Sequence, residues 1–421
     1  MPGEPPPNWP ENPPDGHHIA DGRHAHAVIR PQDTGSLREA IARGGAEGFA
    51  FYPRGGGTAM HVGEPPGRPG WLVDTTALDR VIEYPAADMT ITVEAGTTLA
   101  ALQETLAGQG QHLPLEAPEP SRATLGGIFA TNTCGPRRFG YGRPRDQIIG
   151  VGFINGSGEL VKGGGRVVKN VAGYDLPKLL TGSFGTLGVI CQFTLKVRPR
   201  PADSALVLVT ADRIGLIADW LETLNTSASR PVAIDVLNRP AAAAIPGAGD
   251  SAWTLAIGLE DAKAAIDWQV DRLRTELQGA PISVLRGREA EPAWAALVAF
   301  QATAPGPVKL RGALKPSLLT ALLGGLDGET WAVQAHAGSG VIHAQTRAEQ
   351  PLEELAPRVD NLRAACARAG GYLVVTACPS DFKSRLKVWG DPRSDWALGE
   401  AIKKALDPHN RMNPGRFVAT I

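Results

Sequence analysis

Three consecutive glycines follow a short aromatic stretch in "FYPRGGGTAM" (residues 51–60). We expect a strand over about 48–52 that ends in this turn, because glycine is disfavoured inside strands. The N–H groups of such a turn can form a nest for a pyrophosphate, although a flexible surface loop would also account for this stretch alone. Two more glycine-rich turns, "TLGG" (124–127) and "GSFGTLG" (182–188), favour one long ligand that meets bare main chain in three places.

Several common binding functions are excluded by pattern and charge. The sequence contains no G-x-x-x-x-G-K-[S/T] loop and no strand-to-helix G-x-G-x-x-G followed by an acid, which argues against a P-loop or a Rossmann site. Lys+Arg (42) nearly balance Asp+Glu (43), so we expect no binding to nucleic acid. No apolar run approaches the roughly 20 residues that span a bilayer. The four cysteines are scattered, which favours reduced core thiols of a cytosolic protein over an iron–sulfur cluster.

Helices and a hairpin are expected between the glycine turns of the first half. "SLREAIARGG" predicts a helix capped by Ser36 and Glu39 and ended by Gly44-Gly45. "TTLAALQETLAGQG" (97–110) predicts a second helix with three leucines on one face. Residues 148–164, "IIGVGFINGSGELVKGG", are typical of a β-hairpin.

The second half repeats one pattern of elements. Strand, helix, two strands, helix and strand are expected over 205–285, and the same order returns over 308–376. This β-α-β-β-α-β order is that of the ferredoxin-like unit, so we expect two such units in one antiparallel sheet covered by helices. A linking helix is expected over 291–300. A last helix, with Leu398, Ile402 and Leu406 as its apolar stripe, should end before Pro408.

Five stretches in this order and spacing carry a resemblance to a known family: "PRGGGT", "ATLGGIFATNTCG", "RRFGYGRPRDQIIGVGFINGSGELVKGG", "GYDLPKLLTGSFGTLGV" and "LDPHNRMNPGRF". The chain resembles the vanillyl-alcohol oxidase (PCMH-type) FAD-binding flavoproteins, and among them the FAD-binding subunits of bacterial glycolate oxidases. The resemblance implies an α+β fold: a PCMH-type FAD-binding domain of two α+β subdomains, then the antiparallel-sheet cap. The expected boundaries are a disordered proline-rich arm (1–26), the FAD-binding domain (27–203), the cap or substrate domain (204–380) and a C-terminal helix and Asn-Pro-Gly loop that returns to the FAD-binding domain (381–421).

The resemblance also implies which residues hold FAD. The first turn would wrap the pyrophosphate, the second would run beside the flavin and diphosphate, and the third would line the adenine end. The residues carried over are Pro53, Arg54, Gly55, Gly56, Gly57, Thr58, Ala59, Thr124, Leu125, Gly126, Gly127, Ala130, Thr131, Asn132, Gly185, Gly188, Val189 and Ile190. Members that bind FAD covalently have a histidine where this chain has Thr58, so we expect a non-covalent flavin.

The second half departs from relatives that oxidise D-2-hydroxy acids themselves. Those relatives carry H-x-G-D-G-N-x-H and then G-E-H-G, whereas this chain has "HAGSGVIH" and then "GGYLVVTACPS". His336 and His343 keep the two histidine positions, but Ser339 and Val341 replace the aspartate and the asparagine. Two imidazoles without a carboxylate make a poor metal site, so we expect no metal and two histidines on a plain sheet.

No catalytic residue is identified, and Lys309, Arg311 and Asn413 remain as weak candidates. Lys309 and Arg311, with Lys315 nearby, fall where those relatives hold the substrate carboxylate, and an arginine fork suits a carboxylate. A solvated strand face explains the three cations as well. Asn413 and Arg416 lie in the closing "NPGR" loop, which either returns to the flavin edge or only packs against the first domain.

The resemblance therefore implies a FAD-binding subunit of a heteromeric glycolate (2-hydroxy acid) oxidase or dehydrogenase. Its expected partners are a paralogous FAD-binding catalytic subunit, an iron–sulfur subunit and a small 2-hydroxy acid. The start of the chain lacks a basic n-region and an apolar h-region, so we expect a cytoplasmic protein that reaches the membrane through partners. Two alternatives are a self-sufficient FAD-dependent dehydrogenase for another hydroxy acid or alcohol, and a flavin-bearing scaffold subunit.

Overall fold

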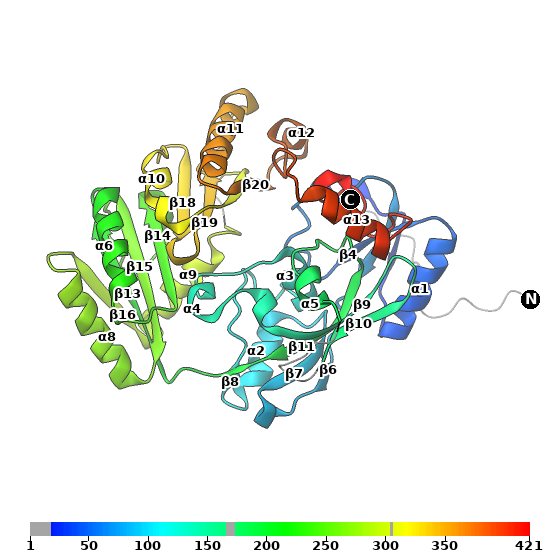
Figure 1. The fold of residues 1–421 in the computed structure, drawn as a ribbon, viewed down its shortest axis with the longest axis horizontal. Helices are drawn as coiled ribbons and strands as arrows, with labels where there is room; N and C mark the ends of the chain where they lie inside the picture. The colour runs from blue at the N-terminus through cyan, green and yellow to red at the C-terminus, as the bar shows by residue number, and fades with distance from the viewer. Residues whose placement is uncertain (1–17, 166–172, 304–305) are drawn as a thin grey trace, which may run out of the picture.

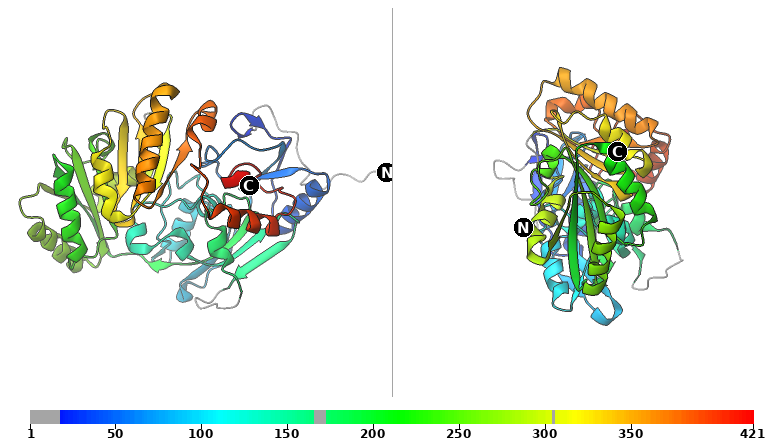
Figure 2. Two further views of the ribbon diagram at one scale, coloured as in Figure 1. Left: turned by 45° about the horizontal axis from the view of Figure 1, so that its top comes forward. Right: turned by 90° about the vertical axis from the view of Figure 1, so that its left-hand side faces the viewer.

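The computed structural model describes residues 18–165, 173–303 and 306–421 as an α+β fold. Two smaller sheets of the first half lie beside one large sheet of the second half (Figure 1). Residues 203–377, which carry the large sheet, are called the cap below. The C-terminal helix and loop turn back from the cap to the first half, as the second orientation also shows (Figure 2).

A three-stranded parallel sheet carries the first glycine turn. Its order is β3-β5-β4, and β4 runs directly into the turn. Helix α1 packs on it through the buried residues Leu37 and Ile41, beside Phe51 and Trp71. The bounds are β3 Ala27–Ile29, α1 Thr34–Ala46, β4 Ala50–Arg54 and β5 Gly70–Asp74.

Helix α1 corrects the sequence prediction at both ends. Its N-cap is Asp33 rather than Ser36, and the Asp33 carboxylate accepts from the Ser36 N–H at 2.7 Å. Ser36 instead takes the third helical position of the capping box. The glycine pair does not end the helix, which runs on to Ala46. A side chain is excluded at Gly44 because a Cβ there would lie 2.6 Å from the Trp71 ring. Glycine is therefore used for close packing here and not as a stop signal.

A five-stranded antiparallel sheet forms the second layer of the first half, in the order β10-β9-β11-β7-β6. The predicted hairpin is confirmed as β9 and β10, and the predicted leucine face of α2 is buried in the core of this sheet. The bounds are β6 Val81–Glu83, β7 Thr90–Glu94, α2 Leu99–Ala107, α3 Leu125–Thr131, α4 Arg138–Tyr141, β9 Ile148–Ile154, β10 Leu160–Gly164, α5 Leu176–Leu180 and β11 Val189–Lys196. A two-stranded sheet, β8 Gln111–His112 with β12 Arg198–Pro199, leads into the cap.

The cap contains one eight-stranded antiparallel sheet with the order β16-β13-β15-β14-β18-β19-β17-β20. This order confirms two ferredoxin-like units, which join edge to edge at β14 and β18. Helices α6, α8, α10 and α11 cover one face, and α7 and α9 pack on the other. The bounds are β13 Asp203–Ala211, α6 Ile214–Thr226, β14 Ala233–Asn238, α7 Arg239–Ala242, β15 Trp253–Asp261, α8 Lys263–Glu276, β16 Ile282–Arg286, α9 Glu291–Ala299, β17 Lys309–Ala313, α10 Leu319–Gly324, β18 Trp331–His336, β19 Val341–Thr346, α11 Leu352–Arg368 and β20 Tyr372–Ala377.

The C-terminal segment is built into the first half. After α12 (Lys383–Leu386) and α13 (Trp396–Leu406), Met412 pairs in parallel with Phe51 of β4. The main chain bonds on both sides of this bridge, from the Phe51 N–H to Arg411 and from the Asn413 N–H to Phe51, both at 2.8 Å. The predicted stripe of α13 is wrong at Leu398, which is 66% exposed, whereas Ile402 and Leu406 pack on the core.

The proline-rich arm predicted for 1–26 is wrong from residue 18 onward. His18–Ala20 (β1) and Arg23–His24 (β2) form a hairpin, and Ile19 and Ala25 belong to a small core with Tyr52. Residues 1–17 lie outside the described residues. No helix within the described ranges combines the length and the apolar character needed to cross a membrane.

Candidate functional site

The three glycine turns meet around one cavity of about 100 Å³, which adjoins a larger one of about 300 Å³ beneath the cap. Thr58, Gly127 and Phe184 line both cavities, so the two spaces are neighbours. All of the carried-over FAD residues except Leu125 and Asn132 line the smaller cavity. Asn132 lines the larger cavity, whereas the Leu125 side chain is fully buried in the core of the five-stranded sheet.

All three glycines of the first turn line the smaller cavity, but the structure gives two different reasons for the absence of a side chain. A Cβ at Gly55 would overlap the Thr124 hydroxyl, and a Cβ at Gly56 would overlap the Arg122 carbonyl. These two glycines allow the first turn to pack against the second. Gly57 differs, because its φ is +77° and a Cβ there would meet no protein atom within 4 Å.

The first turn also presents unpaired backbone donors. Among the described residues, no oxygen accepts from the N–H groups of Gly55, Gly56 and Gly57. On the second turn, Thr124 caps α3 by accepting from the Gly127 N–H at 3.3 Å. A Cβ at Gly127 would touch only that hydroxyl, so the cavity side of the turn is open. Neighbouring unpaired N–H groups with no side chain in front of them suit an anion.

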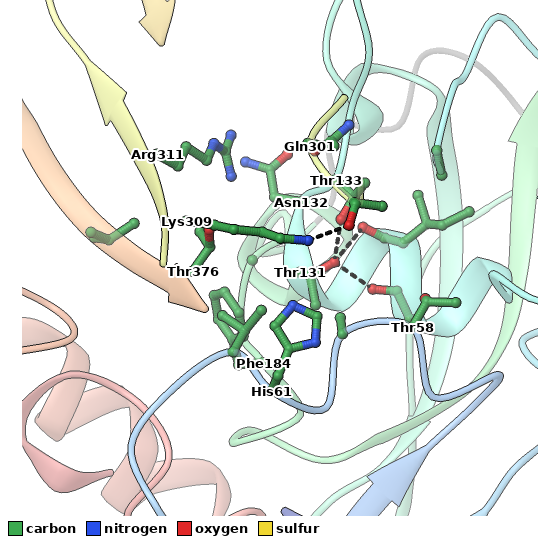
Figure 3. A pocket seen from close by; sticks show the side chains of 18 of the residues that line it. Thr58, His61, Thr131, Asn132, Thr133, Phe184, Gln301, Lys309, Arg311 and Thr376 are labelled. Carbon is green, nitrogen blue, oxygen red and sulfur yellow. Dashed lines mark hydrogen bonds between the residues drawn. The ribbon is translucent and has the colours of Figure 1, made fainter. Parts of the chain in front are cut away.

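The larger cavity lies between the glycine turns and the strand β17 of the cap. Figure 3 shows Lys309 and Arg311 of β17 reaching towards Thr131, Asn132 and His61. Both cations are on the same face of the strand, because side chains alternate. Lys315, the third predicted cation, does not line either cavity. Two cations on one wall of a cleft between two protein parts can hold an anionic group there.

The two cations differ in what already binds them. The Lys309 ammonium donates to the Ala302 carbonyl, and desolvation lowers its pKa below the ordinary lysine value. Arg311 lies beside His343, its cross-strand partner on β19. Burial lowers the pKa of His343 well below its ordinary value, and the nearby His336 and Arg311 lower it further. His343 is therefore a neutral imidazole at the wall of the larger cavity at neutral pH.

The two predicted sheet histidines belong to a buried polar row. Register pairs Asp235 with His336, and the His336 Nδ1 lies 2.8 Å from an Asp235 carboxylate oxygen. The ring centroids of His336 and His343 are 5.3 Å apart. Buried Gln334 also donates to Asp235. Within residues 18–165, 173–303 and 306–421, no group of three or more His, Cys, Asp or Glu side chains is arranged to hold a metal ion.

His61 is the histidine nearest to the glycine turn, and its ring lies in the larger cavity (Figure 3). Its pKa is lowered to about 4, first because the surrounding protein desolvates the imidazole and then because Lys309, Lys383 and Arg416 are close. His61 is accordingly neutral at neutral pH. Thr58, at the position of the covalent histidine in relatives, lines both cavities.

Both residues proposed for the closing loop reach the smaller cavity. The Asn413 amide donates to the Phe184 carbonyl, and Phe184 has a positive φ of 52°. Arg416 lines the same cavity and is 4% exposed. The Phe184 ring stacks on Phe417 with centroids 5.1 Å apart. The C-terminal loop therefore both packs against the first half and lines the smaller cavity. The two predicted roles of this loop occur together.

Sequence reasoning missed several lining residues. Met60 and Val62 follow the first glycine turn directly, and Phe184 lies inside "GSFGTLG", so proximity to a glycine motif would have identified them. Thr75 and Gln301 carry no such signal. They reach the cavities only because β5 lies beside β4 and because α9 ends over the first half, where the Gln301 amide donates to the Cys134 carbonyl at 3.1 Å.

Two family models match this chain. Residues 25–164 match the FAD binding domain, and residues 388–417 match the C-terminal domain of the FAD linked oxidases. The cofactor is therefore FAD. The unpaired N–H groups of the first glycine turn and the open side of Gly127 fit its diphosphate.

Similar proteins extend this result. Glycolate oxidase subunit GlcE of Escherichia coli (strain K12) is 38% identical over 160 residues, which are 37% of this chain and 46% of that protein, so the match spans less than half of its length. Glycolate oxidase subunit GlcD of Bacillus subtilis (strain 168) is 22% identical over 93% of this chain and 89% of that protein. A structure of an alkyldihydroxyacetonephosphate synthase shares the fold, with a TM-score of 0.69, 16% identity, and coverage of 94% of this chain and 78% of that one.

Proposed function

We propose that this chain, which matches the FAD binding domain over residues 25–164 and the C-terminal domain of the FAD linked oxidases over residues 388–417, is an FAD-binding subunit. In this proposal it belongs to a heteromeric oxidase or dehydrogenase for glycolate or a related 2-hydroxy acid. The names of two similar proteins, GlcE and GlcD, support this proposal, since both are glycolate oxidase subunits. The proposal assigns the glycine turns to FAD and the larger cavity to the hydroxy acid.

One observation carries the proposal: the larger cavity adjoins the glycine-lined one, and its cap wall presents Lys309 and Arg311. A 2-hydroxy acid has a carboxylate that these cations can bind, with the arginine as a fork. FAD, when bound, supplies an acceptor for the hydride of the carbon that bears the hydroxyl. The tasks of the chain are then to fix the carboxylate and to keep water from the reacting carbon.

A subunit role is supported by what the second half lacks. Ser339 and Val341 stand where the resemblance implies a carboxylate and an amide in relatives that oxidise hydroxy acids. Within the described ranges, no cluster of His, Cys, Asp and Glu compensates for this change. We therefore assign the hydroxy-acid chemistry of the complex chiefly to a paralogous FAD-binding subunit, and electron transfer towards the membrane to an iron–sulfur subunit. In this assignment the assembly is cytoplasmic and meets the membrane through partners.

The test compares the purified chain with the complex that it forms with the products of neighbouring genes. The chain alone should bind FAD but reduce a dye with glycolate slowly, whereas the complex should do so readily. In the FAD-loaded chain by itself, Arg311→Met should weaken the binding of glycolate, followed as a change in the flavin absorbance, and Arg274→Met, on the exposed side of α8, serves as the matched control. Robust turnover by the lone chain would contradict the subunit role.

The flavin should be held without a covalent bond, because threonine and not histidine occupies position 58. Acid precipitation of the yellow protein should leave the colour in the supernatant. Thr58→Ala should also leave the colour in the supernatant. This control shows that the threonine hydroxyl has no part in how the flavin is attached. Colour that stays in the pellet would contradict the proposal.

A second candidate is a self-sufficient dehydrogenase, and one observation favours it. Such an enzyme needs a base near the flavin in its second half, and His343 is a neutral imidazole at the cavity wall beside Arg311. The lone chain should then oxidise one of a panel of 2-hydroxy acids, and His343→Gln should lower kcat far more than it raises KM. Inactivity of the lone chain on the whole panel would count against this candidate.

A further inference from the structure

The turn of the N-terminal hairpin places one carboxylate between two buried cations. Asp21 joins β1 and β2, and its side chain is 6% exposed. It lies 2.7 Å from the Lys383 ammonium, which comes from α12, and 3.1 Å from the Arg416 guanidinium, which comes from the closing loop. The Ser380 hydroxyl donates to it at 2.9 Å. Three segments that are far apart in the sequence thus share one carboxylate.

The same two cations bind the loop that follows the first glycine turn, residues 60–64. Arg416 donates to the carbonyls of Met60, Val62 and Glu64 at 2.5, 2.6 and 2.8 Å. Lys383 donates to the carbonyls between them, of His61 at 3.1 Å and of Gly63 at 2.7 Å. Every carbonyl of the loop is therefore held by a cation. Main chain so fully bonded has one orientation, and this loop continues directly from Ala59 of the glycine turn.

This loop forms part of the wall of both cavities. Met60 and Val62 line the smaller cavity, and His61 and Val62 line the larger one. Gly63 fits because a Cβ there would overlap the Arg416 carbonyl, so the loop and the closing segment are in direct contact. A change in how the two cations are held would therefore move the wall next to the FAD diphosphate and the cavity beneath the cap.

The cluster contains two buried positive charges and the Asp21 carboxylate that pairs with both, and the half-buried Glu64 carboxylate also lies near enough to act on Lys383 and Arg416. The Lys383 and Arg416 side chains are 3% and 5% exposed, so water screens neither of them well. Removal of one partner of a buried ion pair leaves an uncompensated charge, which destabilises the local structure strongly. Without the Asp21 carboxylate, the two cations would repel each other across the loop that both of them bind.

We propose that Asp21 is a positioning residue for FAD binding. The hairpin fixes Lys383 and Arg416, these fix residues 60–64, and this loop fixes the first glycine turn against the diphosphate. The proposal rests on FAD as the cofactor and on no particular substrate. It also gives the hairpin a function: it sets cofactor affinity from a segment that carries none of the glycine motifs.

The test measures the Kd of the apoprotein for FAD by quenching of flavin fluorescence, well below the melting temperature. Asp21→Asn keeps the shape of the side chain but removes the charge, and it should weaken FAD binding by about tenfold or more, which corresponds to about 1.4 kcal/mol. Asp21→Glu should restore most of the affinity. The visible circular dichroism of the bound flavin should change in Asp21→Asn and return in Asp21→Glu.

Two controls separate positioning from a general loss of stability. Val359→Ala removes core packing from α11 of the cap, so it should lower the melting temperature without changing the Kd for FAD. Asp219→Asn removes an exposed carboxylate on α6 and should change neither quantity. If Asp21→Asn folds and binds FAD as tightly as the unmodified chain, the proposal is wrong.

A milder variant keeps the proposal testable if Asp21→Asn does not fold. Ser380→Ala removes only the neutral hydrogen bond to the same carboxylate. Ser380→Ala should raise the Kd for FAD severalfold, which is a smaller increase than the one expected for Asp21→Asn. An unchanged Kd would overturn the proposal. None of these measurements uses a hydroxy acid, so they give the same answer whether or not the proposed glycolate activity is found.

Discussion

At the scale of single residues, the glycines of the first turn are not equivalent. Gly56→Ala forces a Cβ into the Arg122 carbonyl, and neither backbone can yield easily. Gly57→Ala meets no atom but keeps a positive φ, which costs about 1–2 kcal/mol for a residue with a side chain. We expect Gly56→Ala to lower the free energy of unfolding, and the affinity for FAD, more than Gly57→Ala. Urea denaturation and FAD titration of both variants check this order, and the reverse order would contradict it.

The buried imidazole of His343 should make the protein sensitive to acid. In the folded state, the pKa of His343 lies well below its ordinary value of about 6.5. Just below pH 6.5, the imidazole therefore binds a proton in the unfolded chain but not in the folded chain. The contribution of His343 to the free energy of unfolding should therefore be greatest above about pH 6.5. It should fall as the pH is lowered, by at most about 1.4 kcal/mol per pH unit.

Urea denaturation at several pH values should show a shallower fall for His343→Gln than for the unmodified chain. His409→Gln, which changes an exposed histidine after α13, is the matched control and should keep the original slope. If the free energy of unfolding changed with pH equally in all three proteins, His343 would accept a proton as readily in the folded chain as in the unfolded chain.

At the scale of elements, α13 owes its position to one buried ammonium. The Lys403 Nζ donates to the carbonyls of Thr186 and Met412, both at 2.7 Å, and to the Asp407 carboxylate at 2.6 Å. Asp407 in turn accepts from the Arg411 and Met412 N–H groups. A single cation therefore joins the helix, the third glycine turn and the closing segment beside β4.

Lys403→Met should cost about 3–5 kcal/mol, because it leaves the Asp407 carboxylate buried without its partner. Lys404→Met, one position further on the exposed side of α13, should be nearly neutral. Thermal melting of the apoprotein measures both. A melting temperature of Lys403→Met equal to that of Lys404→Met would show that this cation is not what holds the helix.

At the scale of the whole molecule, one arginine joins the first half to the cap. Arg137, just before α4, pairs with Glu116 and, at 2.6 Å, with Glu260 of β15. Its guanidinium also lies 3.7 Å from the ring centre of Trp294 on α9. The larger cavity depends on this junction, because its walls come from both parts.

Arg137→Met should leave two carboxylates facing each other in a largely buried site, at a cost of about 3–5 kcal/mol. Calorimetry of the variant should resolve two transitions, or one at a lower temperature than in the unmodified chain. Arg145→Met, which removes an exposed ion pair with Asp146, is the control. An unchanged single transition in Arg137→Met would show that the junction is held elsewhere.

Much of the fold could be predicted from the sequence alone. The repeated strand and helix order of the second half predicts the two ferredoxin-like units, because hydrophobic periodicity is a local property that the chain displays directly. The leucines of α2 and the hairpin of β9 and β10 follow for the same reason. The glycine motifs, read through the family resemblance, likewise pointed to most of the residues that line the smaller cavity, since each motif is contiguous in the sequence.

The tertiary structure decided everything that depends on neighbours distant in the sequence. Gly44 was predicted to end the helix but lies inside α1, where glycine is required because the Trp71 ring occupies the space that a side chain would take. Gly55 was predicted as a ligand contact and lines the smaller cavity, but its lack of a side chain is also required by the close packing of Thr124. Asp21 was predicted to lie in a solvated arm, yet its side chain is buried between Lys383 and Arg416 from the other end of the chain. Local propensity fixes which elements form, whereas long-range packing and charge compensation fix which residues are needed to hold the site together.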